Sequence, residues 1–361
     1  MRVVQILPEL NEGGVERGVV ELNREYVKKG LESIIISNGG KLVSQIELDG
    51  GIHIKFDVCS KNILSIYKRV SALKKILKEV KADIIHVRSR VPAWLVYLAN
   101  KKLNIKVIST VHGFNSVSFY SKIMTKADAV ICVSNSIKKY IQKHYQIHDN
   151  IITVIPRGVD LELFNSNRLD LSFISSFKKE YNLNDKLVVS SVGRITQLKD
   201  YETFINAIHI LKNKNINIKA LIVGGVRVDK QDYLNSLKKQ IKELNLEENI
   251  IFTGSQSKIA EIYSLSDVVV SSSKKPESFG RAVAESIAMN TPVIATNHGG
   301  VKDIIIDSIN GYFFEIGDDM DLSNKILKAM DLEFDGYSYI SNTFSLNNMI
   351  KSNLDVYKGL N

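Results

Sequence analysis

Short apolar segments rich in Val and Ile alternate with longer amphipathic segments along the first 165 residues. Continuous β-branched runs predict strands that are buried on both faces. The expected strands are Val3–Leu7, Ser33–Ser37, Ile84–Val87, Lys106–Val111, Ala129–Val133 and Ile152–Ile155. Between them, the spacing of apolar residues indicates helices near residues 16–29, 63–80, 92–102 and 135–146. This alternation predicts a parallel sheet covered by helices on both faces.

The alternation begins again after residue 165, with no internal sequence repeat. The second set of expected strands is Leu187–Val192, Lys219–Val223, Ile250–Phe252, Val268–Ser271 and Pro292–Ala295, and the expected helices lie near 200–213, 230–244, 258–264 and 279–289. A chain of 361 residues fits two domains better than one. We therefore predict an α/β protein with two Rossmann-like domains, residues 1–163 and 164–345, that face each other across a cleft.

The composition is that of an ordinary globular protein, with 44% hydrophobic and 24% charged residues. The sequence has no apolar run of about 18 residues, and Pro8 interrupts the first apolar run too early for a signal peptide. We therefore expect a cytoplasmic protein. Cys59 and Cys132 show no metal-ligand spacing and are expected to be reduced and buried, with a disulfide as the alternative.

The net charge of +9 is unevenly distributed. Residues 1–165 contain 25 Lys and Arg against 15 Asp and Glu, a net charge of +10, whereas the remainder contains 23 against 24, a net charge of −1. The first half is therefore expected to attract an anionic partner, such as a membrane surface, a phosphorylated acceptor or a nucleic acid.

The most basic stretch, residues 61–81, has two interpretations. A helix would align Ile63, Tyr67, Val70, Leu73, Leu77 and Val80 on one stripe, surrounded by Lys61, Lys68, Arg69, Lys74, Lys75, Lys78 and Lys81. It is either an ordinary surface helix packed on the sheet or a peripheral contact with an anionic membrane, to which each cation contributes about 1 kcal/mol. An exposed apolar loop containing Phe119, Tyr120 and Ile123 would add to such a contact.

The most specific motif is the segment 276–285, with sequence PESFGRAVAE, which follows an expected strand and opens a helix. Gly280 lets the backbone approach a ligand closely, and the N–H groups at a helix start favour a phosphate. Glu277 lies in the loop, where it can accept hydrogen bonds from sugar hydroxyls. Glu285 lies on the helix, where it can hold a ribose diol. A helix N-terminus with acidic residues favoured by the dipole is the alternative.

Two glutamates eight positions apart around a Phe-Gly pair resemble the signature of the family 4 retaining glycosyltransferases, and the resemblance extends over essentially the whole chain. It implies the GT-B fold, with Glu277 contacting the donor sugar and Glu285 the nucleotide ribose. The donor-binding residues that it implies are Gly14, Gly193, Arg194, Lys199, Glu277, Ser278, Phe279, Gly280, Arg281 and Glu285.

A second motif, GRITQLK at residues 193–199, directly follows the first expected strand of the second domain. In the family, a similar Arg and Lys bind the donor diphosphate, on which negative charge develops as the glycosidic bond breaks. The only Asp-x-Asp spacing is Asp319-Met320-Asp321, which helix capping explains better than metal binding. By this resemblance, Arg194 and Lys199 would take the place of a metal ion at the donor diphosphate. We therefore expect neither a metal nor a cofactor.

The acceptor is expected on the first domain. The segment 13–17, GGVER, resembles the family's Gly-Gly-x-Glu-Arg loop, in which Gly14 would approach the donor phosphate while Gly13, Glu16 and Arg17 face the acceptor. His112 ends a strand at the place where the family has a His near the reacting sugar. Arg88 and Arg90 follow another strand and are candidates for gripping an anionic acceptor, or form a solvated loop.

Two further segments resemble structural parts of the family. The segment 156–160, PRGVD, resembles the crossing between the domains, for which we expect a role in hinge geometry, not in chemistry. Residues 346–361 resemble the last helix, which packs back onto the first domain.

The predicted function is retaining transfer of a sugar from a nucleotide sugar to a glycan or glycolipid acceptor in envelope polysaccharide or lipopolysaccharide synthesis. The expected catalytic residues are His112, Arg194, Lys199 and Glu277, and the location is cytoplasmic, with possible peripheral attachment at the inner face of the plasma membrane. Three alternatives stay open: a nucleotide-sugar 2-epimerase of the same fold, an inactive nucleotide-sugar binder, and a basic nucleic-acid-binding protein. The last leaves the motif at 276–285 unexplained, so we expect no nucleic-acid partner.

Overall fold

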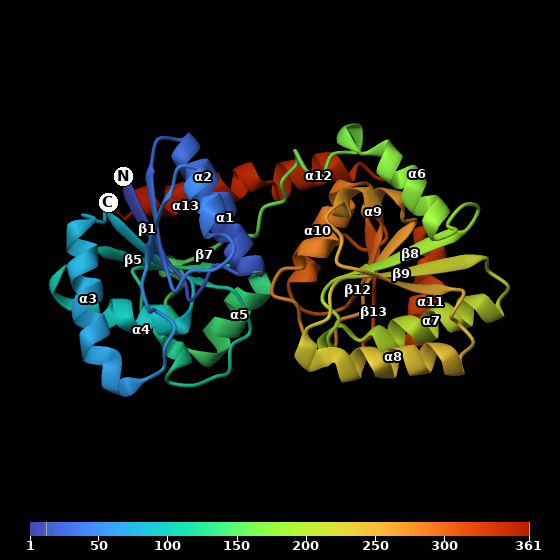
Figure 1. Ribbon diagram of the computed structural model, residues 1–361, viewed down its shortest axis with the longest axis horizontal. Coiled ribbons are helices and arrows are strands. Elements are labelled where there is room, and N and C mark those ends of the chain that lie inside the picture. The colour runs from blue at the N-terminus through green and yellow to red at the C-terminus, as the bar shows by residue number, and fades with distance from the viewer. Residues whose placement is uncertain (12, 361) are drawn as a thin grey trace. The chain divides into compact units, whose positions relative to one another are not determined.

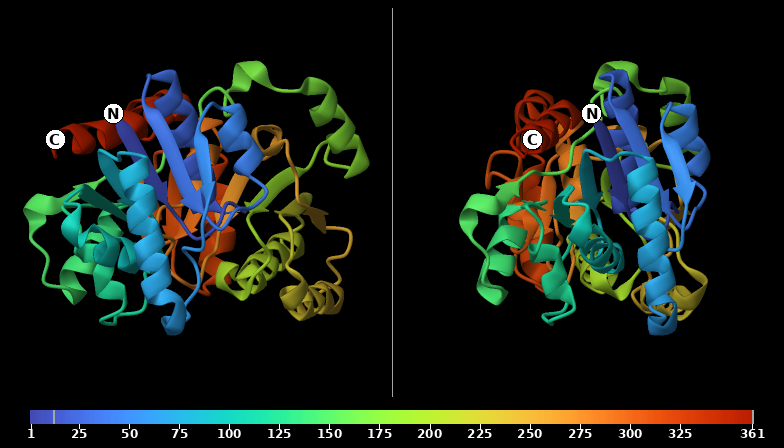
Figure 2. Two further views of the ribbon diagram at one scale, coloured as in Figure 1. Left: turned by 60° about the vertical axis from the view of Figure 1, so that its left-hand side comes forward. Right: turned by 90° about the vertical axis from the view of Figure 1, so that its left-hand side faces the viewer.

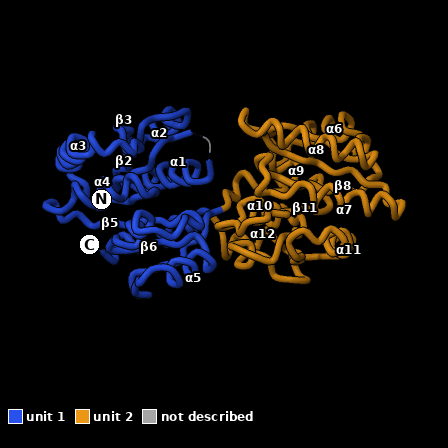
Figure 3. The backbone as a smooth tube through the Cα atoms, turned by 90° about the horizontal axis from the view of Figure 1, so that it is seen from below, with its two compact units in different colours: residues 1–158, 346–361 blue, residues 159–345 orange. Residues whose placement is uncertain are grey.

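A computed structural model describes residues 1–11 and 13–360 and divides into two compact units (Figure 3). Unit 1 contains residues 1–158 and 346–361, and unit 2 contains residues 159–345. The junction therefore lies between residues 158 and 159, not between 163 and 164 as the sequence predicted. The reason is that Val159, which precedes the predicted junction, is buried in a core of unit 2. Phe164 belongs to the same core and packs against Tyr263, with 6.1 Å between ring centroids.

Unit 1 contains a parallel sheet with the strand order β3-β2-β1-β4-β5-β6-β7. Its strands are β1 Arg2–Ile6, β2 Glu32–Ser37, β3 Ile52–Lys55, β4 Ile84–Val87, β5 Lys106–Val111, β6 Ala129–Cys132 and β7 Ile152–Val154. Six of them were predicted. The strand β3 was not predicted. It is a short, partly buried strand at the edge of the sheet, and its four residues contain no continuous apolar run.

The helices of unit 1 are α1 Gly14–Lys28, α2 Val43–Leu48, α3 Ile66–Glu79, α4 Arg90–Ala99, α5 Asn135–His144 and α13 Leu346–Lys358, with 3₁₀ turns η1 Ile63–Ser65, η2 Asn100–Lys102, η3 Ser121–Thr125 and η4 Asp149–Ile151. Helices α3, α4 and α5 share a core with one face of the sheet. Helices α1, α2 and α13 cover the other face (Figures 1 and 2). Strand residues alternate between these two cores, as a doubly covered parallel sheet requires.

Unit 2 contains a second parallel sheet, with the order β10-β9-β8-β11-β12-β13. Its strands are β8 Leu187–Val192, β9 Ile218–Val223, β10 Ile250–Gly254, β11 Val268–Ser271, β12 Val293–Thr296 and β13 Gly311–Phe314. The edge strand β13 was not predicted. It has only four residues, and the first of them is a glycine, which weakens the strand signal of the sequence.

The helices of unit 2 are α6 Leu171–Glu180, α7 Tyr201–Asn213, α8 Gln231–Glu243, α9 Ile259–Leu265, α10 Arg281–Ala288, α11 Asp319–Ala329 and α12 Gly336–Thr343, with 3₁₀ turns η5 Ser166–Arg168, η6 Gln197–Lys199, η7 Val228–Lys230 and η8 Gly300–Asp303. Helices α7, α8 and α11 cover one face of the sheet. Helices α6, α9, α10 and α12 cover the other. Across residues 1–11 and 13–360, no helix has the length and apolar content needed to cross a bilayer.

The predicted apolar stripe of residues 63–80 is only partly correct. Leu73 and Leu77 of α3 are buried in the core, but Ile63 is 79% exposed and Tyr67 is 85% exposed. The buried side chain near the start of α3 is instead Arg69, which is 8% exposed. The helix begins at residue 66, after the turn η1, so the stripe expected from residue 63 does not continue along a single helix.

A chain of buried polar groups ties α13 to the sheet of unit 1. The Tyr26 hydroxyl donates to the Tyr357 hydroxyl, 3.0 Å away, and the Tyr357 oxygen lies 2.6 Å from His86 Nδ1. His86 Nε2 in turn lies 2.6 Å from Thr110 Oγ1. Burial, together with the nearby positive charge of Arg88, holds the pKa of His86 well below its usual value, so the imidazole is neutral and Nδ1 can accept from Tyr357.

Replacing Tyr357 with Phe is expected to lower the free energy of unfolding by about 1–3 kcal/mol, because it leaves buried polar groups of His86 and Tyr26 without a partner. Urea unfolding measures this loss. The control is Tyr67→Phe, at a tyrosine that is 85% exposed, which is expected to change the stability by less than about 0.5 kcal/mol. Equal effects of the two substitutions would show that the buried chain of hydrogen bonds contributes nothing to stability.

Candidate functional site

The two predicted donor motifs of unit 2 lie at one point of its sheet. Strand order reverses between β8 and β11, which are hydrogen-bonded neighbours. The loop after β8 carries residues 193–199, and the loop after β11 carries residues 272–280. Open parallel sheets bind ligands outside the carboxyl ends of the strands at such a reversal. The fold therefore brings together two segments that are about 80 residues apart in the sequence.

An ion pair joins these two loops. Lys199 Nζ lies 2.5 Å from Glu277 Oε1, and the two side chains are 25% and 22% exposed. Ser273 Oγ also donates to Glu277 Oε1 at 2.9 Å, and Ser271 Oγ donates at 3.4 Å. The ion pair and both serine hydroxyls all use the same carboxylate oxygen, Oε1 of Glu277. The pair is therefore fixed on one side and keeps donors and acceptors available to a ligand.

The environment of Glu277 keeps this carboxyl group ionised. Burial alone would raise the pKa of Glu277, but the charge and hydrogen bond of Lys199 and the hydroxyls of Ser273 and Ser271 outweigh it, so the pKa lies below its usual value. A carboxylate, unlike a carboxylic acid, accepts hydrogen bonds only, which suits recognition of hydroxyl groups.

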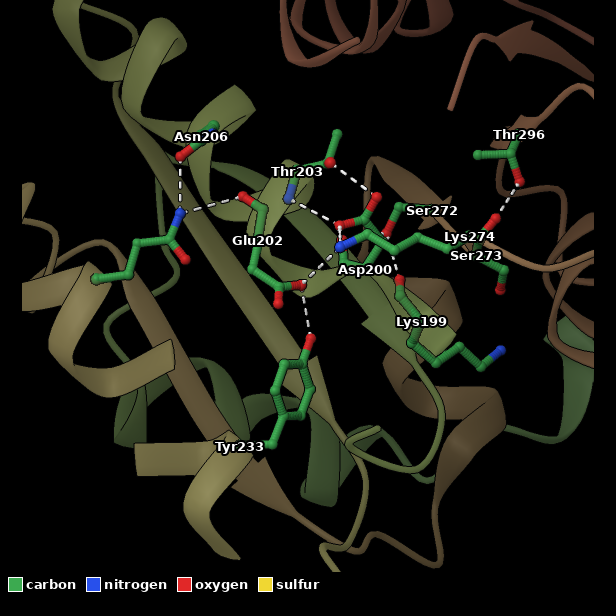
Figure 4. Close-up of polar contacts among 11 residues, drawn as sticks. Lys199, Asp200, Glu202, Thr203, Asn206, Tyr233, Ser272, Ser273, Lys274 and Thr296 are labelled. Carbon is green, nitrogen blue, oxygen red and sulfur yellow. Dashed lines mark hydrogen bonds and ion pairs between the residues drawn. The ribbon is translucent and has the colours of Figure 1, made fainter. Parts of the chain in front are cut away.

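A buried network holds the backbone at Lys199 in place (Figure 4). Asp200 has left-handed backbone angles (φ 51°, ψ 53°), is 1% exposed, and caps helix α7 through the backbone N–H of Thr203. Lys274 Nζ lies 3.0 Å from Asp200 Oδ1, and Ser272 Oγ donates to the backbone oxygen of Lys199 at 2.8 Å. Asp200 and Lys274 were absent from the predicted site, although an Asp directly before an expected helix is a recognisable cap signal.

Glycines allow the loop of Glu277 to pack tightly. Gly280 has φ 108°, and a Cβ there would lie 2.7 Å from Val301 Cγ1. A Cβ on Gly299 (φ 77°) would lie 2.5 Å from the backbone oxygen of Glu277. The same oxygen accepts a hydrogen bond from the N–H of Gly300 at 2.7 Å. The Gly-Gly turn after β12 therefore supports the backbone of Glu277 directly.

Replacing Gly280 with Ala is expected to destabilise the protein by about 1–3 kcal/mol from backbone strain, with a further cost from the contact with Val301. The control is Gly317→Ala, because Gly317 has φ 79° but open space at its Cβ, so that it carries strain without the clash. Thermal unfolding of both variants separates the two effects. A loss at Gly280 no greater than at Gly317 would contradict the proposed close packing.

Glu285 is an internal partner as well as a candidate ligand. Arg281 Nε lies 3.2 Å from Glu285 Oε1, and the Tyr263 hydroxyl donates to Oε2 at 3.3 Å. The Glu285 side chain is 12% exposed. Arg281 and Glu285 therefore form an i, i+4 pair on α10, and Arg281 is occupied by Glu285 in this structure.

The other donor-motif residues have unequal access to a ligand. Phe279 is 3% exposed and packs against Phe344, with 5.8 Å between ring centroids. Its predicted contact with the donor is therefore limited to its backbone, because its side chain belongs to the core. Arg194 is exposed in the loop after β8, and Ser278 is partly exposed. Gly193 permits the position of Lys199, since a Cβ there would lie 2.9 Å from Lys199 Cε.

In unit 1, the segment 13–17 begins α1 directly after the loop from β1. Gly13 is the N-cap, and a Cβ on it would clash with Glu16 Oε2, because the Glu16 carboxylate folds back over the start of its own helix. Gly14 and Arg17 are exposed. The structure thus explains Gly13 by the close approach of Glu16.

His112 has an unpredicted partner, Arg157. Arg157 Nη2 lies 3.1 Å from His112 Nδ1, and Nη1 donates to the backbone oxygen of Gly14. Burial and the positive charges of Arg157 and Arg88 hold the pKa of His112 well below its usual value, and the neighbouring His86 lowers it further. Because a guanidinium only donates, His112 Nδ1 accepts and Nε2 carries the hydrogen. Within the described residues, the buried Nε2 has no hydrogen-bond partner, so the structure leaves it as a donor for an acceptor atom.

Arg157 lies in the segment 156–160, which the resemblance assigns to hinge geometry and which contains the junction of the two units. Its side chain also connects Gly14 with His112. These contacts span 143 and 45 positions of the sequence. No local pattern signals them.

The first of the two arginines after β4 is not part of a solvated loop, which was one of the two interpretations of Arg88 and Arg90 from the sequence. Arg88 is 7% exposed and donates to Gln5 Oε1 and to Thr110 Oγ1. Arg90 donates to Ser121 Oγ at 3.1 Å and lies 5.5 Å from the ring centroid of Tyr120. Both nevertheless line, with His112, a cavity of about 230 Å³. Their guanidinium groups therefore form part of its wall while their own hydrogen bonds fix them.

The Asp-x-Asp spacing lies at a helix start. Asp319 and Asp321 occupy the first turn of α11, and the side chain of Asp318 accepts from the backbone N–H of Asp321 at 2.8 Å. A helix N-terminus favours such acidic residues electrostatically. Capping accounts for this spacing, as the sequence analysis expected.

The two halves of the chain match two sequence families. Residues 173–343 match the family described as glycosyl transferases group 1, and residues 12–163 match the family described as glycosyltransferase family 4. The capsular polysaccharide biosynthesis glycosyltransferase CapM of Staphylococcus aureus is 29% identical over 343 residues, which cover 88% of this chain and 84% of CapM. The UDP-Gal:α-D-GlcNAc-diphosphoundecaprenol α-1,3-galactosyltransferase of Escherichia coli is 27% identical over 291 residues, covering 75% and 72%.

A solved structure is similar over the full length. The crystal structure of a glycosyltransferase from Rickettsia africae is 32% identical, with a TM-score of 0.92, and the match covers 99% of this chain and 98% of that one. The two parallel-sheet units and these relatives agree with the resemblance that the donor motifs indicated. The chain therefore belongs to the family 4 glycosyltransferases of the GT-B type.

Proposed function

We propose that this glycosyltransferase transfers a sugar, with retention of anomeric configuration and without a metal, from a nucleotide sugar to a glycan or glycolipid acceptor in envelope glycan synthesis. The observation that carries the donor site is the Lys199–Glu277 ion pair at the strand-order reversal of unit 2. It unites a cation suited to a diphosphate with a carboxylate suited to sugar hydroxyls.

In the proposed complex, Lys199 and Arg194 contact the donor diphosphate, and Glu277 accepts hydrogen bonds from the sugar through Oε2. The backbone N–H groups of residues 279–281 lie at the start of α10, where a helix favours a phosphate. Glu285, on the same helix, binds the ribose hydroxyls. It then gives up part of its hydrogen bonding to Arg281 and Tyr263.

The acceptor is assigned to unit 1, near Glu16, Arg17 and His112. The donor N–H that we assign to His112 Nε2 can hydrogen-bond a sugar hydroxyl or phosphate oxygen, and Arg157 fixes the ring that carries it. Arg157 is thus proposed as a positioning residue for His112. Arg88 and Arg90 give the adjoining cavity a positive wall that suits an anionic acceptor.

In the proposed reaction, an acceptor hydroxyl oxygen bonds to the anomeric carbon on the face that the diphosphate leaves. The bond from that carbon to the diphosphate oxygen breaks, and the hydroxyl proton passes to the departing diphosphate. Configuration is retained because attack and departure share one face. Lys199 and Arg194 stabilise the negative charge that develops on the diphosphate, the role we assign to them in place of a metal.

The acceptor class and the location follow from charge and from the relatives. Unit 1 carries the basic excess of the chain, and the Escherichia coli relative is named for a lipid-linked acceptor. We propose action at the cytoplasmic face of a membrane, on an envelope polysaccharide or lipopolysaccharide precursor, with residues 61–81 facing the anionic surface.

The test is nucleotide release from a panel of UDP-, GDP- and ADP-sugars by the purified protein, with a chelator present. Release from one donor that survives chelation supports both the donor site and metal independence. Release that stops with chelator and returns with a divalent cation would overturn metal independence alone. The absence of release and of binding across the panel would overturn the donor-site assignment.

The products separate transfer from the 2-epimerase alternative. A glycosyltransferase releases the nucleoside diphosphate and, with an acceptor, forms a glycoside whose anomeric proton coupling in the NMR spectrum reports retention or inversion. An epimerase reaction that keeps the nucleotide on the sugar yields an isomer of the donor without an acceptor. Formation of that isomer would overturn the proposal of transfer.

A further inference from the structure

Unit 1 contains an apolar cavity that the proposed reaction does not use. It lies among the segment before α3, the start of α4 and the residues before η3, and its volume is about 610 Å³, within the range of about 300–1,000 Å³ usual for ligand pockets. Its lining is Ser60, Lys61, Asn62, Ile63, Ile66, Arg69, Val91, Trp94, Leu95, Phe119 and Tyr120. Most of these side chains are aliphatic or aromatic, so the cavity suits a hydrocarbon group.

The rim of this cavity exposes large apolar side chains to solvent. Ile63 and Phe119 are each 79% exposed, and the adjacent Leu64 is 91% exposed. Trp94 connects α4 with the residues before η3. Its Nε1 donates to the backbone oxygen of Tyr120 at 3.0 Å, and the ring centroids of Trp94 and Phe119 are 5.7 Å apart. Such a continuous apolar surface on a folded unit indicates a binding site.

One cation is built into the wall. Arg69 is 8% exposed, and its Nε donates to Ser65 Oγ at 3.1 Å while Nη2 donates to the backbone oxygen of Asn62 at 3.0 Å. Its buried Nη1 has no hydrogen-bond partner. Among residues 1–11 and 13–360 Arg69 forms no direct ion pair, although its charge helps to lower the pKa of Asp57. A buried guanidinium without a direct ion-pair partner is costly. An anionic group on the ligand would satisfy it.

We propose that this cavity binds one hydrocarbon chain of a phosphate-bearing membrane lipid, whose phosphate lies at Arg69. Arginine recognises phosphate through charge-assisted hydrogen bonds, and the exposed Lys61 at the cavity and Lys68 on α3 add attraction to an anionic surface. The inference rests on the proposed glycolipid acceptor: a unit anchored in this way meets an acceptor that is itself carried in the bilayer.

Trp94 reports occupancy of the cavity, because it is the only tryptophan of the chain. The full-length protein is mixed with phosphatidylglycerol vesicles whose acyl chains carry bromine, a contact quencher, and with matched brominated phosphatidylcholine vesicles. We expect strong quenching of Trp94 by the anionic vesicles and little by the neutral ones. Cosedimentation with the anionic vesicles without quenching would overturn the proposal, because the protein would then only adsorb to their surface.

Matched variants test the two parts of the site. Arg69→Gln is expected to weaken vesicle binding about tenfold or more, from the loss of a charged hydrogen bond. Lys68→Gln removes the same charge from an exposed position of the same helix and is expected to have a smaller effect. Equal weakening by both would refute the role of Arg69. Val91→Phe fills the cavity and keeps every charge, so quenching is expected to fall while electrostatic binding persists; unchanged quenching would also refute the proposal.

The result is independent of the donor site. Nucleotide release by the same preparation is measured without vesicles. Release without quenching would overturn the lipid cavity and leave the proposed reaction standing. Quenching without release or donor binding would overturn the proposed donor site and leave the lipid cavity standing.

Discussion

Replacing Lys199 with Met lowers the rate of donor turnover by a factor of about 10² to 10³, the usual effect of removing one group that stabilises developing charge. Lys199 is a cation that the fold holds at the strand-order reversal. Glu277 fixes its side chain, and the Ser272 hydroxyl donates to the backbone oxygens of Lys199 and Asp200. Met keeps a similar length and apolar stem, so the substitution removes mainly the charge. Nucleotide release under saturating donor measures the effect.

The control is Lys275→Met, since Lys275 is an exposed cation in the neighbouring loop. It loses the same charge and is expected to keep nearly full turnover. If both variants lose turnover equally, the effect comes from the general positive potential of the loops. If Lys199→Met keeps full turnover, Lys199 does not stabilise the leaving diphosphate.

Replacing Glu277 with Gln is expected to lower kcat/KM by a factor of about 10 to 10², because removing a charged hydrogen bond costs about 1.5–3 kcal/mol. The substitution has two consequences: the donor sugar loses a charged acceptor, and Lys199 loses its ion-pair partner. Turnover over a range of donor concentrations measures the effect. A variant with unchanged kcat/KM would contradict the assignment of the donor sugar to Glu277.

Glu277 also predicts a pH dependence of stability. The pKa of Glu277 is lower in the folded state than in the unfolded state. Its ionised form therefore stabilises the fold fully above the unfolded-state pKa of about 4.3. This stabilisation is lost as the pH falls through the folded-state pKa. Unfolding measured from pH 6 downward should therefore show a steeper loss below about pH 4.3 in the wild-type protein than in Glu277→Gln. Identical slopes would show that the ion pair does not set the protonation of Glu277.

The sequence predicted the parts of the fold that local periodicity determines. Eleven expected strands appear in the two sheets, whereas the two short edge strands β3 and β13 lack a continuous apolar run and were missed. The junction of the units was placed too late, because Val159 precedes the predicted boundary and yet contributes to the core of unit 2. Only tertiary packing reveals that contribution.

The candidate site divides in the same way. Glu277, Gly280 and the loop of Lys199 could be proposed from the sequence, because each motif occupies consecutive positions, and the fold brings the two loops together. The partnership of Arg157 with His112 and the enclosure of Arg88 could not be proposed, because each depends on residues from distant strands and loops. Arg69 was counted among the surface cations, since periodicity does not show that a helix beginning at residue 66 turns this side chain inward.

We propose above all that unit 2 binds the donor diphosphate between the loops after β8 and β11. The most direct measurement is a crystal structure of the protein with the nucleoside diphosphate of its donor bound. We expect diphosphate oxygens within hydrogen-bonding distance of Lys199 Nζ, with the nucleotide ribose near Glu285. A diphosphate bound away from Lys199 and from the start of α10 would contradict this donor site.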